Sequence, residues 1–431
     1  MTAASLWACV VLAGILQLAS GSEQLPSSST DPGPLFLTPL IEACNFTEAK
    51  NRSNVTLFKE AGINANAHSG YITVNKTANS NLFFLFIEAE DKPSTAPLML
   101  WTQGGPGFSA LFGMLLQNGP LAFQLPANLS KREHSIQKNV SVIYLDVPGR
   151  EFYAAGDSYS ARYSVALAQE MLMCQSDDVN LTFEGTIGGV GFLGPILDLA
   201  DSSNFLYQAS MLDTNGYAAF KLQFETMRNL TATGNISYYP LVIGMLATTL
   251  FASEPKTLFQ NLTLYNSQAS PLYTEMPLSM LAFFAFANTS DFKKAIHVGE
   301  NTKFEFVNPN LLVSLAADFL VDIRETVQYV LNRTRVLFYT GQLDTLFPSP
   351  NLQNYFETLS WTHAHTYRAA SRRTWKPYDL YYGAAAYLKS AKNFTSAVVL
   401  GMGHYGAFDK PLEVYHLMME FINRNLSFAP I

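Results

Sequence analysis

The sequence predicts an α/β fold with a mostly parallel central sheet, because three β-rich runs each end at a turn. They read PLMLWTQGGPG from Pro97 to Gly107, VLFYTGQLD from Val336 to Asp344, and AVVLGMGH from Ala397 to His404. The first run is apolar without interruption, which is typical of a strand buried on both faces. The other two place a carboxylate and an imidazole at the carboxyl end of a strand, where open α/β sheets bind ligands.

The stretch FYAAGDSYSARY, from Phe152 to Tyr163, has the sequence form of a nucleophile elbow with Ser158 as the nucleophile. Such an elbow turns sharply from strand to helix, and the small residues Gly156, Ser160 and Ala161 leave room for the turn. The usual pattern has Gly two residues after the nucleophile, where this chain has Ser. An ordinary strand followed by a turn would give the same pattern, so the prediction of an elbow also needs support from other motifs in the chain.

The amino-terminal residues predict entry into the secretory pathway. Residues 1–21 contain the apolar core LWACVVLAGIL followed by small residues, as in a cleaved signal peptide, and residues 22–34 form a Pro- and Ser-rich arm. No later stretch is apolar for long enough to span a bilayer, so no membrane span is expected. Fourteen N-x-S/T sequons favour a glycosylated product that is secreted or delivered to a lysosome or another vesicle: Asn45, Asn51, Asn54, Asn75, Asn128, Asn139, Asn180, Asn229, Asn235, Asn261, Asn288, Asn332, Asn393 and Asn425.

Charge and composition exclude several classes of partner and cofactor. The net charge is −7 and no Lys/Arg cluster is present, which argues against nucleic acid or an anionic membrane. The GGPG loop is short and lacks the Lys of a phosphate loop, so no nucleotide is expected. The pair His363 and His365 has no evident third ligand, so we expect no metal and no cofactor. Beyond the leader, Cys44 and Cys174 remain, which could form one disulfide.

Several motifs together resemble the serine carboxypeptidases, and most closely the vitellogenic-like carboxypeptidases. WTQGGPGFSALFGMLLQNGP resembles the family's W-x-N-G-G-P-G-x-S segment, GDSYSA its G-E-S-Y-x-G elbow, and PLFLTPLIEA its amino-terminal segment. The runs ending at Asp344 and His404 resemble the strands that deliver the catalytic acid and base. The resemblance implies an α/β-hydrolase fold, with core segments 35–200 and 301–431 and an inserted helical cap at 201–300.

The resemblance also implies the catalytic machinery. Ser158 would attack a peptide carbonyl, His404 would take its proton, and Asp344 would orient the imidazole. The oxyanion hole would be formed by the backbone N–H groups of Gly105 and Tyr159. The expected activity is removal of carboxyl-terminal residues from peptides or proteins. The alternatives are transfer of the acyl group to another acceptor, and an inactive, glycosylated binding or storage protein of the same fold.

The family grips the substrate's terminal carboxylate with a hydrogen-bonded cluster, which maps here to Trp101, Gln103, Gln117 and Asp157. Three of these depart from the family pattern, since Gln103 replaces Asn, Gln117 replaces Glu and Asp157 replaces Glu. Amides donate hydrogen bonds at any pH, whereas a carboxyl group donates only when protonated. We therefore expect a weaker preference for acid than in an enzyme with two carboxyl groups at this position.

One family segment is missing from the chain. Serine carboxypeptidases have a long segment with a helix between the strand matching VSVIYLDVPG and the nucleophile strand, but here Asp146 is followed closely by Phe152. Parallel strands normally need a crossover of at least about a dozen residues. A tight turn at Pro148 and Gly149 would instead give an antiparallel hairpin, with Ser158 at the wrong end of the sheet. We therefore expect a shortened family member that folds poorly or has little activity.

Overall fold

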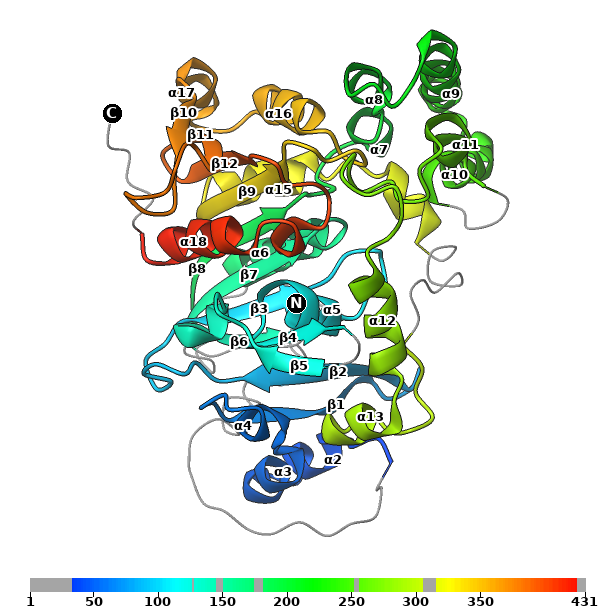
Figure 1. Cartoon of the computed structure of the whole chain (residues 1–431). Helices are drawn as coiled ribbons and strands as arrows, with labels where there is room; N and C mark the ends of the chain where they lie inside the picture. Colours follow the sequence, from blue (N-terminus) through cyan, green and yellow to red (C-terminus); the bar gives the residue numbers. More distant parts are fainter. Residues whose placement is uncertain are drawn as a thin grey trace.

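The computed structural model describes residues 33–125, 128–144, 150–173, 181–251, 256–304 and 315–424. Ten strands form one sheet in the order β1-β2-β6-β3-β7-β8-β9-β12-β11-β10, and β4 and β5 form a separate pair (Figure 1). The strands are β1 (Ala67–Asn75), β2 (Ser80–Ile87), β3 (Leu98–Thr102), β4 (Leu121–Gln124), β5 (Asn128–Lys131), β6 (Ser141–Tyr144), β7 (Arg150–Asp157), β8 (Leu181–Gly189), β9 (Arg335–Gly341), β10 (Arg373–Trp375), β11 (Ala386–Ala391) and β12 (Phe394–Val399).

The middle of the large sheet is parallel and its two edges are antiparallel. Strands β6, β3, β7, β8, β9 and β12 pair in parallel, while β1 pairs with β2, β2 with β6, and β10 to β12 with one another in antiparallel fashion. The predicted mostly parallel sheet is confirmed.

Helices cover both faces of the sheet, and others extend beyond its carboxyl edge. The helices and helical turns in chain order are α2 (Thr38–Glu42), α3 (Phe46–Ser53), α4 (Leu57–Glu60), α5 (Ala110–Phe112), η1 (Gly113–Asn118), η2 (Ile136–Lys138), α6 (Ser160–Met173), α7 (Ile196–Leu199), α8 (Ser203–Gln208), α9 (Thr214–Ala232), η3 (Ile236–Tyr238), α10 (Tyr239–Leu246), η4 (Ala247–Phe251), α11 (Leu258–Thr263), α12 (Leu278–Ala287), α13 (Ser290–Ala295), η5 (Ala316–Leu320), α15 (Arg324–Leu331), α16 (Ser349–Thr358), α17 (Ala364–Ala369), η6 (Gly406–Phe408) and α18 (Pro411–Ile422). None of the helices in the described part of the chain is long and apolar enough to cross a membrane.

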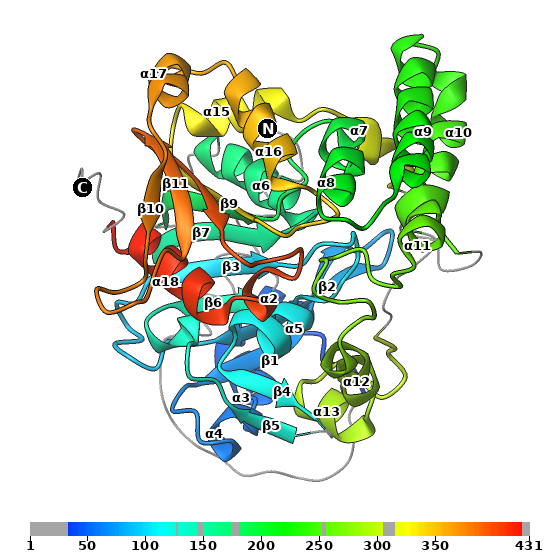
Figure 2. The same cartoon turned by 45° about the horizontal axis from the view of Figure 1, so that its top comes forward.

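The described segments between β8 and β9 are largely helical: the elements from α8 to α13 lie within residues 201–300, the segment expected to form the cap, whereas α7, η5 and α15 lie outside it. Local signals explain two of them: Asp213 accepts a hydrogen bond from Gly216 N at the start of α9, and Thr257 and Gln260 form a capping box that begins α11. Figure 2 shows α9, α10 and α11 grouped on the side toward which the arrow of β7 points. They therefore stand beyond the edge of the sheet where ligands are expected.

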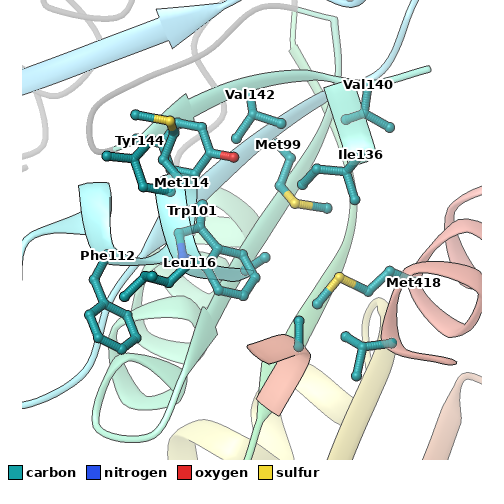
Figure 3. Close-up of a cluster of buried hydrophobic side chains, with 14 of the residues drawn as sticks. Met99, Trp101, Phe112, Met114, Leu116, Ile136, Val140, Val142, Tyr144 and Met418 are labelled. Atoms are coloured by element: carbon teal, nitrogen blue, oxygen red, sulfur yellow. The ribbon is translucent and has the colours of Figure 1, made fainter. Parts of the chain in front are cut away.

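Alternating side chains of β3 divide between two layers of core. Met99 and Trp101 pack into the cluster that includes Met418 of α18, with Trp101 surrounded by aliphatic and methionine side chains (Figure 3). Leu98 and Leu100 pack into a cluster on the opposite face, against which Leu167 of α6 packs. This alternation is the period of two that a strand buried on both faces requires.

The predicted antiparallel hairpin between the strands flanking residues 145–149 is wrong. Strands β6 and β7 do not pair with each other, because β3 lies between them and pairs with both in parallel; Leu100 of β3 is opposite Ile143 on one side and Ala154 on the other. The arrangement buries all three apolar strands inside the sheet. Pro148 and Gly149, proposed as the turn, lie outside the described residues.

The distance from the end of β6 to the start of β7 is short enough for the two strands to run parallel. In the register, Tyr144 is level with Trp101 and Ala155, so Arg150 begins five residues before that level and two strand positions away. That is about 17 Å along the strand and about 10 Å across it, or about 20 Å in a straight line. Six Cα steps reach about 20–22 Å, which is just enough.

A cavity of about 470 Å³ lies between the sheet and α6. The described residues that line it carry no charge and come from β2, β3, the loop after β3, α5, β7 and α6: Leu82, Leu100, Thr102, Gln103, Gly107, Phe108, Ala110, Ala154, Ala155, Tyr163, Ser164 and Leu167. Right-handed crossovers that step in the same direction along a sheet cover the same face, so a helical β6–β7 crossover would pack beside α6. The cavity lies on that face.

Candidate active site

Ser158 lies on the sharp turn between β7 and α6, as predicted. Its φ is +61°, in the left-handed region that a nucleophile elbow imposes on its Ser, and its N–H donates to Gly189 O at 2.8 Å. A Cβ atom on Gly156 would lie 2.6 Å from Ser160 Oγ, which is why the elbow needs glycine there. Ser160, which replaces the family's Gly, is fully buried, and its hydroxyl is hydrogen-bonded to Thr102 Oγ1.

The structure brings Ser158, His404 and Asp344 together at the carboxyl edge of the sheet. Nε2 of His404 lies 2.9 Å from Ser158 Oγ, and Nδ1 of His404 lies 2.9 Å from Asp344 Oδ2. The second carboxylate oxygen, Oδ1 of Asp344, accepts hydrogen bonds from Leu346 N at 2.9 Å and Phe347 N at 2.8 Å. Asp344 is fully buried, so these contacts fix the carboxylate, and through it the imidazole.

Two opposing effects act on the pKa of His404. Burial disfavours the charged ring, but the adjacent Asp344 carboxylate, with smaller contributions from Asp157 and Asp409, outweighs burial and raises the pKa above its ordinary value. The imidazolium that forms when His404 takes a proton is therefore stabilised. Because Asp157 contributes only when ionised, protonation of Asp157 removes one of the causes that raise the pKa of His404.

The loop after β3 packs directly on the elbow. A Cβ atom on Gly104 would lie 2.8 Å from Asp157 O, 2.8 Å from Ser158 Cβ and 3.1 Å from Tyr159 N. Among the described residues, neither the N–H of Gly105 nor that of Tyr159 has a hydrogen-bond partner. The loop and the elbow are thus packed together, and each contributes an unpaired N–H group of the kind that an oxyanion hole needs.

The four residues of the predicted carboxylate cluster form two hydrogen-bonded pairs. Trp101 Nε1 donates to Gln103 Oε1 at 3.2 Å, and Gln117 Nε2 donates to Asp157 Oδ2 at 3.2 Å. The pairs lie at the two ends of η1: a Cβ atom on Gly113 would lie 2.3 Å from Trp101 Nε1, and Gln117 is four residues further along. All four side chains are buried.

The hydrogen bonds of Gln117 differ from the expectation that it donates to substrate. Its Nε2 also donates to Tyr405 O at 2.9 Å, so both of its N–H groups are used within the protein. Its Oε1 is buried without a partner among the described residues. Nε2 of Gln103, by contrast, has no partner among the described residues, which leaves it as the free amide donor of the cluster.

Asp157 is the titratable group of the cluster. Burial raises the pKa of Asp157 to about 6, although the hydrogen bonds from Tyr339 and Gln117 and the charge of His404 oppose this. Tyr339 OH donates to Asp157 Oδ1 at 2.5 Å. Tyr339 lies in the predicted strand VLFYTGQLD, but strand alternation alone does not identify which side chain of a neighbouring strand its hydroxyl meets.

Other candidate groups stay apart from this site. His365 lies within α17, and in the described part of the chain no group of three or more His, Cys, Asp or Glu side chains could hold a metal ion. Cys44 is exposed, and Cys174 lies outside the described residues. The polar side chains gathered at the site are therefore those of Ser158, His404, Asp344 and the buried cluster beside them.

Comparison with known proteins now places this geometry in a family. The family model described as serine carboxypeptidase matches residues 58–150 and 149–424. The chain belongs to the serine carboxypeptidase family. It is thus classed with the hydrolases, as an exopeptidase. The family match is divided at residues 149 and 150, which is the position of the short step between β6 and β7.

Individual relatives cover nearly the whole chain. The human probable serine carboxypeptidase CPVL is 27% identical over 95% of this chain and 94% of its own length. The venom serine carboxypeptidase of Apis mellifera is 29% identical over 90% of each, and the vitellogenic carboxypeptidase of Aedes aegypti is 25% identical over 95% and 94%. These relatives agree with the resemblance seen in the motifs.

A solved structure confirms the fold class. The prohormone-processing carboxypeptidase Kex1(delta)p of Saccharomyces cerevisiae matches 93% of this chain and 97% of its own with a TM-score of 0.63, at 15% identity. The chain has the α/β-hydrolase fold, in agreement with the prediction.

Proposed function

We propose that this protein is a serine carboxypeptidase in which Ser158, His404 and Asp344 act as a catalytic triad. The observation that carries the proposal is the continuous pair of 2.9 Å contacts from Ser158 Oγ through His404 to Asp344 Oδ2. His404 takes the proton from Ser158 as the hydroxyl attacks the scissile carbonyl carbon, and a tetrahedral intermediate forms. The unpaired N–H groups of Gly105 and Tyr159 stabilise its oxyanion.

Collapse of the intermediate breaks the peptide bond. His404 gives its proton to the leaving amino group, which departs with the carboxyl-terminal residue and leaves an acyl-enzyme on Ser158. Water then attacks the ester carbonyl with His404 again as the base, and the second product is released. Asp344 orients the ring and stabilises the imidazolium.

Exopeptidase specificity follows from recognition of a free terminal carboxylate. The free N–H of Gln103 Nε2 donates to it at any pH, while Asp157 donates only when protonated. Because the pKa of Asp157 is raised to about 6, its ionisation above that pH places a negative charge beside the substrate carboxylate. Binding of peptides with a free carboxyl terminus therefore weakens as the pH rises through 6.

The proposal is tested by active-site labelling and product analysis together. A fluorophosphonate should add once per chain at Ser158, and a blocked dipeptide with a free carboxylate should be hydrolysed, whereas the same dipeptide with an amidated terminus should be a poor substrate. An unlabelled, folded chain would favour the inactive binding or storage protein. Labelling with transfer of the acyl group to an added acceptor, and little hydrolysis, would favour an acyltransferase.

The cellular setting is part of the proposal. We place the protein in the secretory pathway, as a secreted or lysosomal enzyme that acts on peptide or protein carboxyl termini. Eleven of the fourteen sequon asparagines are exposed in the described structure, as glycosylation requires: Asn45, Asn51, Asn54, Asn75, Asn128, Asn139, Asn229, Asn235, Asn261, Asn332 and Asn393. Asn288 is half-buried and its Nδ2 donates to Phe284 O and Phe304 O, so it is the least suited of the described sequons.

A further inference from the structure

A short irregular segment of the cap, residues 267–273, contacts the two loops that carry the triad's acid and base. Gln268 O accepts a hydrogen bond from Thr345 Oγ1 at 2.5 Å, and the next carbonyl, Ala269 O, accepts from the backbone N–H of His404 at 2.8 Å. Thr345 directly follows Asp344 in the chain. Adjacent carbonyls of the cap thus bind the base itself and the neighbour of the acid.

Tyr273, at the end of the same segment, supports the His404 loop from another side. Its hydroxyl donates to Asp409 Oδ1 at 2.9 Å, and Asp409 Oδ2 accepts from Gly403 N, the residue before His404, at 2.8 Å. A Cβ atom on Gly403 would lie 2.5 Å from Ser270 Cβ and 2.9 Å from Ala269 O, so the loop and the segment are in close contact.

The His404 loop has little support of its own. Strand β12 ends at Val399 and η6 begins at Gly406, so His404 lies in irregular backbone between them. Its backbone is held by the 267–273 segment, by Asp409 and by the bond from Leu343 N to Met402 O at 2.8 Å. Two side chains outside this segment add single bonds on either side of His404, from Gly401 N to Gln342 Oε1 at 3.1 Å and from Gln117 Nε2 to Tyr405 O at 2.9 Å. Ser267, Ala269 and Ser270 are buried, which gives this part of the cap a fixed place against the core.

We infer that the 267–273 segment positions His404 against Ser158, and that Tyr273 and Asp409 are positioning residues of the reaction. The inference rests on the proposed function and goes beyond it, because it makes part of the cap a support of the catalytic base rather than a cover over the substrate. Displacement of the segment moves His404 without removing any group that touches substrate. The effect should therefore appear in kcat, since misplacing a catalytic group by about 1 Å can cost about a hundredfold in rate.

The test compares Tyr273→Phe with Tyr217→Phe. Tyr217 is also a cap tyrosine, but its hydroxyl donates to Asn204 Oδ1 within the cap, away from the catalytic loops. We expect Tyr273→Phe to lower kcat by about tenfold with KM nearly unchanged, and Tyr217→Phe to leave both unchanged. Asp409→Asn should lower kcat similarly, and the double variant should lose little more than the larger single loss.

Labelling separates this inference from the proposed function. Fluorophosphonate should still label Tyr273→Phe fully at Ser158, only more slowly, and the NMR resonance of the proton between His404 Nδ1 and Asp344 should shift. Failure of wild-type labelling would overturn the proposed function, whereas equal kcat for Tyr273→Phe, Tyr217→Phe and wild type would overturn the positioning role alone. A rise in KM at constant kcat would also overturn it, because the segment would then act on substrate binding.

A second variant covers the case in which Tyr273→Phe does not fold. Thr345→Val keeps the shape of the side chain and removes the hydrogen bond to Gln268 O on the other side of the segment. It should lower kcat severalfold with KM unchanged. Unchanged kcat in folded Thr345→Val would overturn the inference.

Discussion

Two regions of the molecule differ in how fully their groups are packed and paired. One is the carboxyl edge of β7, β9 and β12, and the other is the face of β2 and β3 that α6 covers. At the edge, each nitrogen of the His404 ring has a partner at 2.9 Å and both oxygens of Asp344 are hydrogen-bonded. On the α6 face, a pocket of about 470 Å³ with uncharged lining residues lies between β2, β3, β7 and α6. The two regions share β3 and β7, so the incomplete packing on one side has not displaced the catalytic groups.

This difference shows which part of the family architecture positions the triad. Ser158, Asp344 and His404 are held by strand order, by tight turns at strand ends and by contacts with the cap. These contacts hold the three side chains together although β6 and β7 are joined by a connection of only five residues. The expectation of low activity depended on an antiparallel hairpin, and that reason does not hold; poor folding stays a prediction.

The largest expected effect is the loss of activity when the nucleophile at the carboxyl edge is removed. Ser158→Ala should lower kcat/KM for a blocked dipeptide by about 10⁴-fold or more, because it deletes the nucleophile. His404→Ala should lose a similar factor, and the double variant should lose no more than the single ones, because the triad acts as a unit. Steady-state rates measure this. Activity of Ser158→Ala well above that of the double variant would show that another group supplies the nucleophile.

A second prediction concerns the cluster beside the triad. Gln117→Glu places a second carboxyl group against Asp157, where the wild-type contact is 3.2 Å, so two groups rather than one lose a donor proton and gain negative charge as the pH rises. We expect KM for free-carboxylate peptides to rise about tenfold more between pH 5 and 7 than in wild type. Asp157→Asn should flatten the profile.

The control for this pH profile is a blocked ester that lacks a free carboxylate. With that substrate, kcat/KM should fall only as His404 becomes protonated at low pH. In Asp157→Asn that fall should move to lower pH, because the ionised Asp157 helps to raise the pKa of His404. Identical dependence of KM on pH in wild type and Gln117→Glu would contradict the claim that carboxyl groups at this position control substrate binding.

The smallest expected effect is a difference in stability between two substitutions in β2, one at the pocket on the α6 face and one in the core on the other face. Leu82 of β2 lines the cavity, whereas Leu85 on the same strand is fully buried in the core on the other face. Leu82→Phe should be neutral or stabilising by up to about 1 kcal/mol, and Leu85→Phe should destabilise by about 1–3 kcal/mol through overpacking. Thermal unfolding measures both. Equal destabilisation would mean that the cavity cannot accept added volume, and slower labelling of Ser158 in Leu82→Phe would link the two regions.

Elements with local sequence signals could be predicted from the sequence, whereas contacts that depend on which strands are neighbours could not. Ser158, Asp344 and His404 each follow a β-rich run at a turn, so their meeting at one edge follows from a parallel sheet. The hydrogen bond from Tyr339 to Asp157 depends on which strands are neighbours, which a single strand does not encode. The direction of β7 was predicted wrongly because a local turn signal at Pro148 and Gly149 was weighed above the pairing that β3 offers on both of its sides.

The most direct test of the account expresses the chain as written beside a version with a helical crossover inserted between Tyr144 and Arg150. Intact mass after fluorophosphonate treatment reports assembly of the triad, and the midpoint of thermal unfolding reports packing on the α6 face. The account predicts one adduct at Ser158 in both proteins, at similar rates, and a higher midpoint for the version with the crossover. Labelling only of the version with the crossover would contradict it, because the missing segment would then be required for the catalytic site itself.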